Sequence, residues 1–86
     1  MTALLTTQTL GGTANVALTG DVSVIVSGNF SGGAVVRLDL EADSLRKSPT
    51  YIRKPDTLSI KGKTGMTLTA TVTQGNSECS IDVSVL

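Results

Sequence analysis

Residues 66–73 read MTLTATVT, with a threonine at every second position from Thr67 to Thr73. Apolar side chains fill the alternate positions, so an extended chain would carry hydroxyl groups on one face only. Because successive side chains of a β-strand point to opposite faces, this alternation predicts a strand with one face on a core. Helical periodicity is nearly absent from the rest of the chain. The stretch therefore indicates an antiparallel sheet that is buried on one side.

The same alternation occurs in residues 36–42 (VRLDLEA) and 79–85 (CSIDVSV), and thirteen threonines in the chain suit a pleated surface. Less regular candidate strands are residues 3–10, 15–19, 22–27, 51–54 and 57–61. Glycine pairs between the candidates supply the backbone freedom that tight turns need. The sequence therefore predicts an all-β fold, a single antiparallel β-sandwich or jelly roll of about seven or eight short strands, with residues 1–86 as one domain.

One polar segment, residues 43–50 (DSLRKSPT), interrupts this pattern and contains one of the two prolines. It is the longest expected connection between strands. We expect a crossover between sheets or a loop at a contact surface.

The chain lacks the residues that most catalytic sites require, because it has no His and only one Cys, Cys79. The common zinc sites and Ser–His or Cys–His nucleophiles cannot be assembled from this composition. Cys79 falls on the apolar side of residues 79–85, where a thiol acts as a small apolar group. Gly62-Lys63-Thr64 resembles the end of a phosphate-binding loop, but position 57 is Thr, so we expect a hairpin turn. No enzyme activity, cofactor or metal site is predicted from these residues.

Carboxylates two residues apart occur at Asp39, Glu41 and Asp43, on the outward face of one expected strand. Oxygen ligands of this kind could hold Ca²⁺. Three residues along one flat edge do not wrap an ion, so the favoured alternative is a solvated face that pairs with basic neighbours. Both interpretations stay open at this point.

The charges are segregated along the chain, although the net charge is zero. Residues 46–63 carry a net charge of +5 and contain six of the seven cations: Arg46, Lys47, Arg53, Lys54, Lys61 and Lys63. We expect these residues to contact an acidic partner, the alternative being dispersed solubilising charge. Zero net charge argues against nucleic acid as a partner, and no apolar run is long enough for a membrane span or a secretion signal.

A core built from 86 residues is small, and such domains commonly depend on disulfides, a metal or partner subunits. A lone Cys79 cannot form an internal disulfide. Assembly with copies of itself or with another protein is therefore expected.

Residues 20–38 (GDVSVIVSGNFSGGAVVRL) resemble a pattern in small β-sandwich virion proteins of tailed bacteriophages. In that family an alternating strand ends in Gly-x-Phe-x-Gly and leads to a second strand that begins with Ala or Thr and Val. The resemblance implies a capsid decoration (cement) protein that stabilises the phage head by bridging capsid subunits. It further implies a homo-oligomer, in particular a trimer, that binds the major capsid protein or another virion protein. The location would then be the virion, assembled in the host cytoplasm.

Two other functions fit the same residues. A small tail-fibre or head-fibre module would bind a receptor or glycan, for which Tyr51 is the available aromatic platform. A non-viral sandwich domain would bind an intracellular protein partner.

Overall fold

The computed structural model describes residues 2–42, 45–46, 49–75 and 78–86. Within these residues the chain forms strands and one short 3₁₀ turn, η1 (Ser31–Gly33), and contains no helix long and apolar enough to cross a membrane. The all-β prediction is confirmed. The strands are β1 (Thr2–Gln8), β2 (Thr13–Leu18), β3 (Val22–Asn29), β4 (Val35–Ala42), β5 (Leu45–Arg46), β6 (Thr50–Ile52), β7 (Asp56–Ile60), β8 (Met66–Gln74) and β9 (Ser80–Val85).

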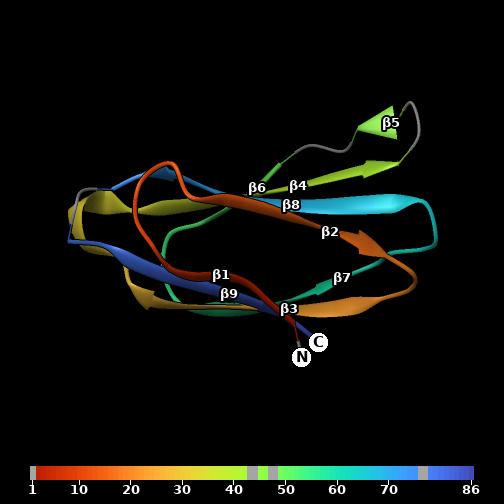
Figure 1. Ribbon diagram of the computed structural model, residues 1–86, viewed down its shortest axis with the longest axis horizontal. Helices are drawn as coiled ribbons and strands as arrows, with labels where there is room; N and C mark the ends of the chain where they lie inside the picture. Colours follow the sequence, from red (N-terminus) through yellow and green to blue (C-terminus); the bar gives the residue numbers. More distant parts are fainter. Residues whose placement is uncertain (1, 43–44, 47–48, 76–77) are drawn as a thin grey trace.

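The strands form two antiparallel sheets that lie face to face, as Figure 1 shows. The four-stranded sheet has the order β1-β9-β3-β7, and the five-stranded sheet has the order β2-β8-β4-β5, with β6 also paired to β4. The pairs are nested: β1 with β9, β2 with β8, β3 with β7, and β4 with β6. This nesting is the jelly-roll arrangement, in which one long antiparallel ribbon is folded into two sheets.

The core lies between the sheets and is built by the alternation that the sequence shows. Leu68 and Ala70 of β8 are buried, and the threonines that alternate with the apolar residues of this strand are not. Ile81 and Val83 of β9 face them from the other sheet and are fully buried. Val36 of β4 is also fully buried, as expected from residues 36–42. No buried side-chain polar atom among the described residues lacks a hydrogen-bond partner, so burial leaves no uncompensated polar group there.

Most connections pass from one sheet to the other. Residues 61–65 join β7 of the four-stranded sheet to β8 of the five-stranded sheet, so the expected hairpin there is wrong. The glycine chemistry of a turn fits a hairpin and a link between sheets equally well. The local sequence therefore could not separate the two.

The polar segment 43–50 does not cross between the sheets. β5 lies within it and β6 begins at its end, and both pair with β4 of the same sheet. The crossover to the four-stranded sheet is made instead by residues 53–55, which lead from β6 to β7. Residues 43–44 and 47–48 lie outside the described residues.

The two ends of the chain lie side by side, as Figure 1 shows. Thr2 of β1 pairs with Val85 of β9. The last strand is not at a border, because β9 lies between β1 and β3.

Candidate interaction surface

The described cations of residues 46–63 lie on the two connections that flank β7. Arg53 and Lys54 precede this strand, Lys61 and Lys63 follow it, and all four side chains are exposed. The five residues of β7, a length of about 17 Å, separate the two pairs. Since β7 is a border strand, we name these four residues the basic border. The four described cations of the predicted basic stretch therefore lie along one long side of the sandwich, two at each end of β7.

The other two predicted contact residues cannot be placed in the same way. The backbone of Arg46 is in β5, but its side chain lies outside the described part of the structure. Lys47 lies outside the described residues altogether.

Tyr51 contacts Arg53, one of the first pair of cations. The guanidinium carbon of Arg53 lies 5.8 Å from the centroid of the Tyr51 ring, within the range of a cation–π contact. Tyr51 is 49% exposed, and residues 51–54 with Asp56 line a hollow of about 270 Å³. Because one carboxylate oxygen of Asp56 accepts a hydrogen bond from the backbone N–H of Thr57 at 2.8 Å, that carboxylate is held toward its own strand. The hollow combines two cations and a ring with this one carboxylate, and the excess of positive charge suits an acidic side chain of a partner.

An acidic residue distant in sequence partly offsets the second pair. The Lys61 ammonium lies 3.6 Å from a carboxylate oxygen of Asp21, in the connection between β2 and β3. The other oxygen of Asp21 accepts a hydrogen bond from the backbone N–H of Gly62 at 3.0 Å. Both charged side chains are mostly exposed, at 89% and 63%, so solvent screens the ion pair and it contributes little stability. Sequence reasoning missed Asp21 because only the fold brings it to this border.

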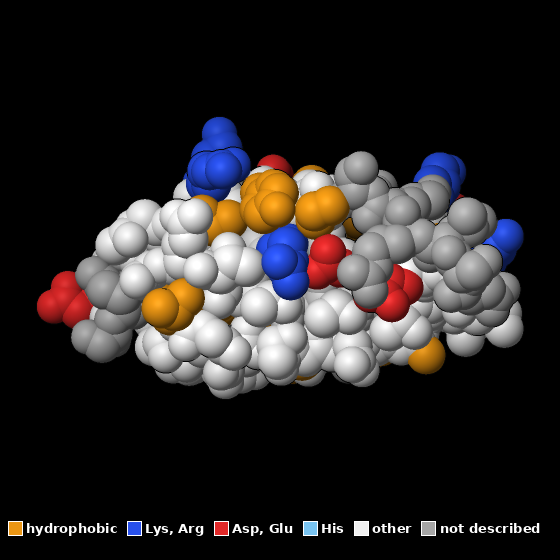
Figure 2. Space-filling model, turned by 90° about the horizontal axis from the view of Figure 1, so that it is seen from above, with side chains coloured by type: hydrophobic (Ala, Val, Ile, Leu, Met, Phe, Trp, Pro, Cys, Tyr) orange, Lys and Arg blue, Asp and Glu red, His pale blue; other side chains and the backbone are white. Residues whose placement is uncertain are grey.

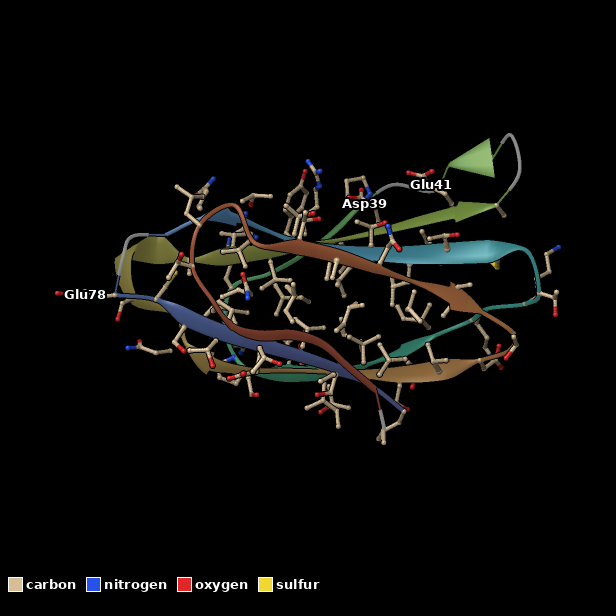
Figure 3. The ribbon with its side chains drawn as sticks, in the orientation of Figure 1. Asp39, Glu41 and Glu78 are labelled. Carbon is tan, nitrogen blue, oxygen red and sulfur yellow. The ribbon has the colours of Figure 1, made fainter. Side chains whose placement is uncertain are left out.

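The carboxylates of β4 lie on the outer face of the five-stranded sheet, pointing away from the core (Figure 3). The Nε of Arg37 donates a hydrogen bond to a carboxylate oxygen of Asp39 at 2.9 Å, so a cation already neutralises this carboxylate. Among the described residues no group of three or more acidic, Cys or His side chains is placed to hold a metal ion. Asp43, the third member of the expected cluster, lies outside those residues.

A shallow groove of about 460 Å³ runs over this outer face. Residues of β2, β8 and β4 line it together with Pro49. The hydroxyl oxygens of Thr13 and Thr71 lie 3.0 Å apart, and Thr69 lies beside them. The lining therefore combines hydroxyl groups with the Arg37–Asp39 ion pair, and Tyr51 pairs with Arg37 in the sheet register.

The thiol of Cys79 is buried at 2% exposure, as the alternation predicts. It belongs to the apolar core cluster, with Val83 and Ile81 of the following strand. A thiol held there is not accessible to a substrate from solvent.

The border opposite β7 is formed by strands whose described residues carry no charged side chain of their own. The Asp82 carboxylate of β9 reaches it, where one of its oxygens accepts a hydrogen bond from the Thr7 N–H of β1 at 3.0 Å. Residues 1–20 contain no Asp, Glu, Lys or Arg, and they include both β1 and β2. Each of these strands is the border strand of its sheet. Figure 2, which looks onto the outer face of the five-stranded sheet, shows the Lys and Arg side chains away from its lower border. The sequence shows that residues 1–20 lack charged side chains, but only the fold shows that β1 and β2 lie on the same side of the sandwich.

Comparisons with protein-family models, with curated proteins and with solved structures found no match.

Proposed function

We propose that this chain is a structural virion protein, a capsid decoration protein that stabilises a phage head by bridging capsid subunits. In this proposal the basic border contacts acidic surface of the major capsid protein or another virion protein, and copies of the chain associate with one another. It acts by binding and not by catalysis. It works in the virion, on particles assembled in the host cytoplasm.

The observation that carries the proposal is the division of charge between the two sides of the sandwich. The four cations of the basic border are exposed on one side, and residues 1–20, which form the other side, contribute no charged side chain to it. A molecule divided in this way can be steered onto an acidic surface through one side while its other side remains available for neutral contacts.

Two further observations support the proposal. The jelly roll is a fold that viral capsid and lectin domains share, which is support by analogy of fold. Residues 20–38, which resemble phage virion proteins, form β3, η1 and the first half of β4. They therefore make one of the links that join the two sheets.

Stabilisation follows from linkage. A protein that binds the assembled shell but not free subunits shifts the assembly equilibrium toward the shell. The free energy gained rises with the number of occupied sites, so many weak contacts can stabilise one particle.

The test is quantitative mass spectrometry of purified particles from the virus that encodes the chain. Hundreds of copies per particle would support decoration of the head. A handful of copies would point to a tail or vertex component. Absence from the particles would contradict the proposal and favour the non-viral interaction domain.

The groove on the five-stranded sheet favours one second candidate, a glycan-binding module of a fibre. Its hydroxyl groups and the Arg37–Asp39 ion pair are the kinds of groups that hold a sugar, and the exposed ring of Tyr51, opposite Arg37 on β6 but outside the groove lining, could stack on one. Saturable binding on a glycan array that Tyr51→Ala removes would support this candidate. Loss of the same binding in Thr57→Ala, on the far sheet, would show that the groove is not the site.

A further inference from the structure

The border strands of this sandwich differ in how they are protected from pairing with another chain. An exposed strand edge offers unpaired N–H and C=O groups, and proteins blunt such edges with bulges, charges, proline or short strands. The pairing of β1 with β9 shifts register twice, and Thr7 has a φ of 51° there. Pro55 and Lys61 flank β7, which begins at Asp56. β5 and β6 have only two and three residues.

β2 has none of these protections. It runs for six residues as TANVAL, without a charge or a proline. Its pairing with β8 is unbroken from Thr13 to Leu18. The strand is therefore regular and neutral along its whole free side.

The hydrogen bonds at the start of β2 identify which of its backbone groups face outward. The Val72 N–H donates to the Gly12 carbonyl at 2.8 Å, so Gly12 is a hydrogen-bonded partner of β8. Antiparallel strands alternate hydrogen-bonded and non-hydrogen-bonded pairs, so Ala14, Val16 and Leu18 also bond to β8. The N–H and C=O groups of Thr13, Asn15 and Ala17 then point away from β8, and β2 has no further strand beside it in the sheet.

We propose that β2 pairs with β2 of a second copy of this chain, antiparallel about a two-fold axis. All three outward-facing residues find a partner within the strand when Asn15 lies opposite Asn15 of the partner copy. Thr13 then lies opposite the partner copy's Ala17. Each of these residue pairs exchanges two backbone hydrogen bonds. The two five-stranded sheets become one continuous sheet, with the axis between the two Asn15 residues.

The side chains of β2 suit this pairing. Those opposite one another on the outer face are small or uncharged, so no charge is buried and none repels its counterpart. On the inner face Ala14 and Val16 pack on the core but are only partly buried. Their apolar surface is covered further when the partner strand arrives. Leu10, in the turn before β2, is 54% exposed on the same uncharged side.

The pairing goes beyond the proposed function, because it requires only a second copy and no capsid. It also differs from the trimer implied by the resemblance to phage proteins. Pairing about a two-fold axis occupies the free β2 edge of both copies, so no β2 edge is left for a third copy.

The first test measures mass and dissociation by analytical ultracentrifugation over a dilution series. The wild-type chain is expected at twice its 8.8 kDa mass, dissociating on dilution. Asn15→Lys sets two like charges side by side at the axis and should raise the dissociation constant about fivefold or more. Thr57→Lys adds the same charge at an exposed threonine of β7, and it should leave the dissociation constant unchanged. Far-UV circular dichroism checks that both variants are folded.

The second test determines the register by oxidation of variants that each carry one added cysteine. The native Cys79 is buried and should not cross-link. Asn15→Cys places two Cα atoms about 5.5 Å apart across the axis, within the roughly 4.4–6.8 Å that a disulfide spans. Thr13→Cys places its two copies about 13 Å apart, so it should not form the bond.

Any of several results would overturn the pairing. These are a wild-type chain that stays at single-chain mass at its highest soluble concentration, a trimer, an Asn15→Lys variant that dimerises as well as wild type, or equal cross-linking at positions 13 and 15.

Discussion

At the scale of single residues, the lone thiol shows how closely the core is packed. Cys79, which directly precedes β9, is 2% exposed. A Cβ built on Gly75 would lie 3.0 Å from its sulfur and 3.2 Å from the Cβ of Ala34, so the backbone of Gly75 passes close to both side chains. There is little room beside this sulfur for a water molecule.

Replacing the thiol by a hydroxyl should therefore be costly. Cys79→Ser buries a polar group for which the described surroundings are apolar, and we expect a loss of about 1–3 kcal/mol in the free energy of unfolding. Cys79→Ala is the matched control, because it removes the sulfur without adding a polar group. Urea denaturation followed by circular dichroism measures both. Equal stability of the two variants would show that water reaches the site.

The position of Cys79 could be predicted because it depends on the alternation of its own strand. The contact of Lys61 with Asp21 could not be predicted, since the two residues are forty positions apart in the sequence. They meet only because the β2–β3 connection and the β7–β8 connection lie at the same end of the sandwich. The basic border was predicted as a cluster in sequence, and its division into two pairs along β7 depends on the length of that strand.

At the scale of elements, the contact between β3 and β9 depends on one glycine. Gly28 pairs with Ile81 of β9 and has a φ of 112°, in the region that side chains rarely adopt. A Cβ at this position would clash with the backbone carbonyl oxygen of Ser80. The close approach of the two strands is therefore compatible only with glycine.

We expect Gly28→Ala to lower the free energy of unfolding by about 3 kcal/mol, from backbone strain together with the clash. Gly33→Ala is the matched control. Gly33 also has a positive φ, 72°, but a Cβ there would meet no atom within 4 Å. Strain alone should cost about 1 kcal/mol at Gly33. Urea denaturation midpoints of the two variants measure the difference, and similar midpoints would mean that β3 can move away from β9.

The strands with strict alternation were predictable, and the connections were less so. Residues 66–73 and 79–85 carry enough apolar and polar contrast to fix both their structure and their buried face. β5 was missed because it has two residues beside a proline-containing segment, and only its pairing with Glu41 and Ala42 of β4 makes it a strand. Strand pairing across long sequence separations is a tertiary property that local propensity does not encode.

At the scale of the whole molecule, the two-layer architecture was predictable but the nested order of its strands was not. The alternation in the sequence predicts that one face of each sheet must be buried, but many orders of the strands would bury these faces equally well. The nested order decides that all charge-free residues of β1 and β2 share one side while the basic border occupies the other. In the proposed function, these two sides of the sandwich contact different partners.

The proposed steering by the basic border gives a prediction for binding to assembled particles. The double variant Arg53→Gln/Lys54→Gln should slow association with capsids at low salt, and the difference from wild type should shrink as salt screens the charges. Ala3→Glu/Thr6→Glu changes the net charge by the same amount at exposed residues of β1. Surface plasmon resonance on immobilised particles compares them. A similar slowing in both would show that net charge matters and the basic border does not.

The inner position of β9 has a consequence for the order of events during synthesis. β1 and β3 leave the ribosome early, yet in the finished sheet they touch β9 and not each other. The four-stranded sheet thus stays split until residues 80–85 have been translated and inserted between strands made some fifty to eighty residues earlier. A nascent chain stalled before that point would hold two strands apart with the core open to solvent, so protection by chaperones matters most until residues 80–85 have emerged.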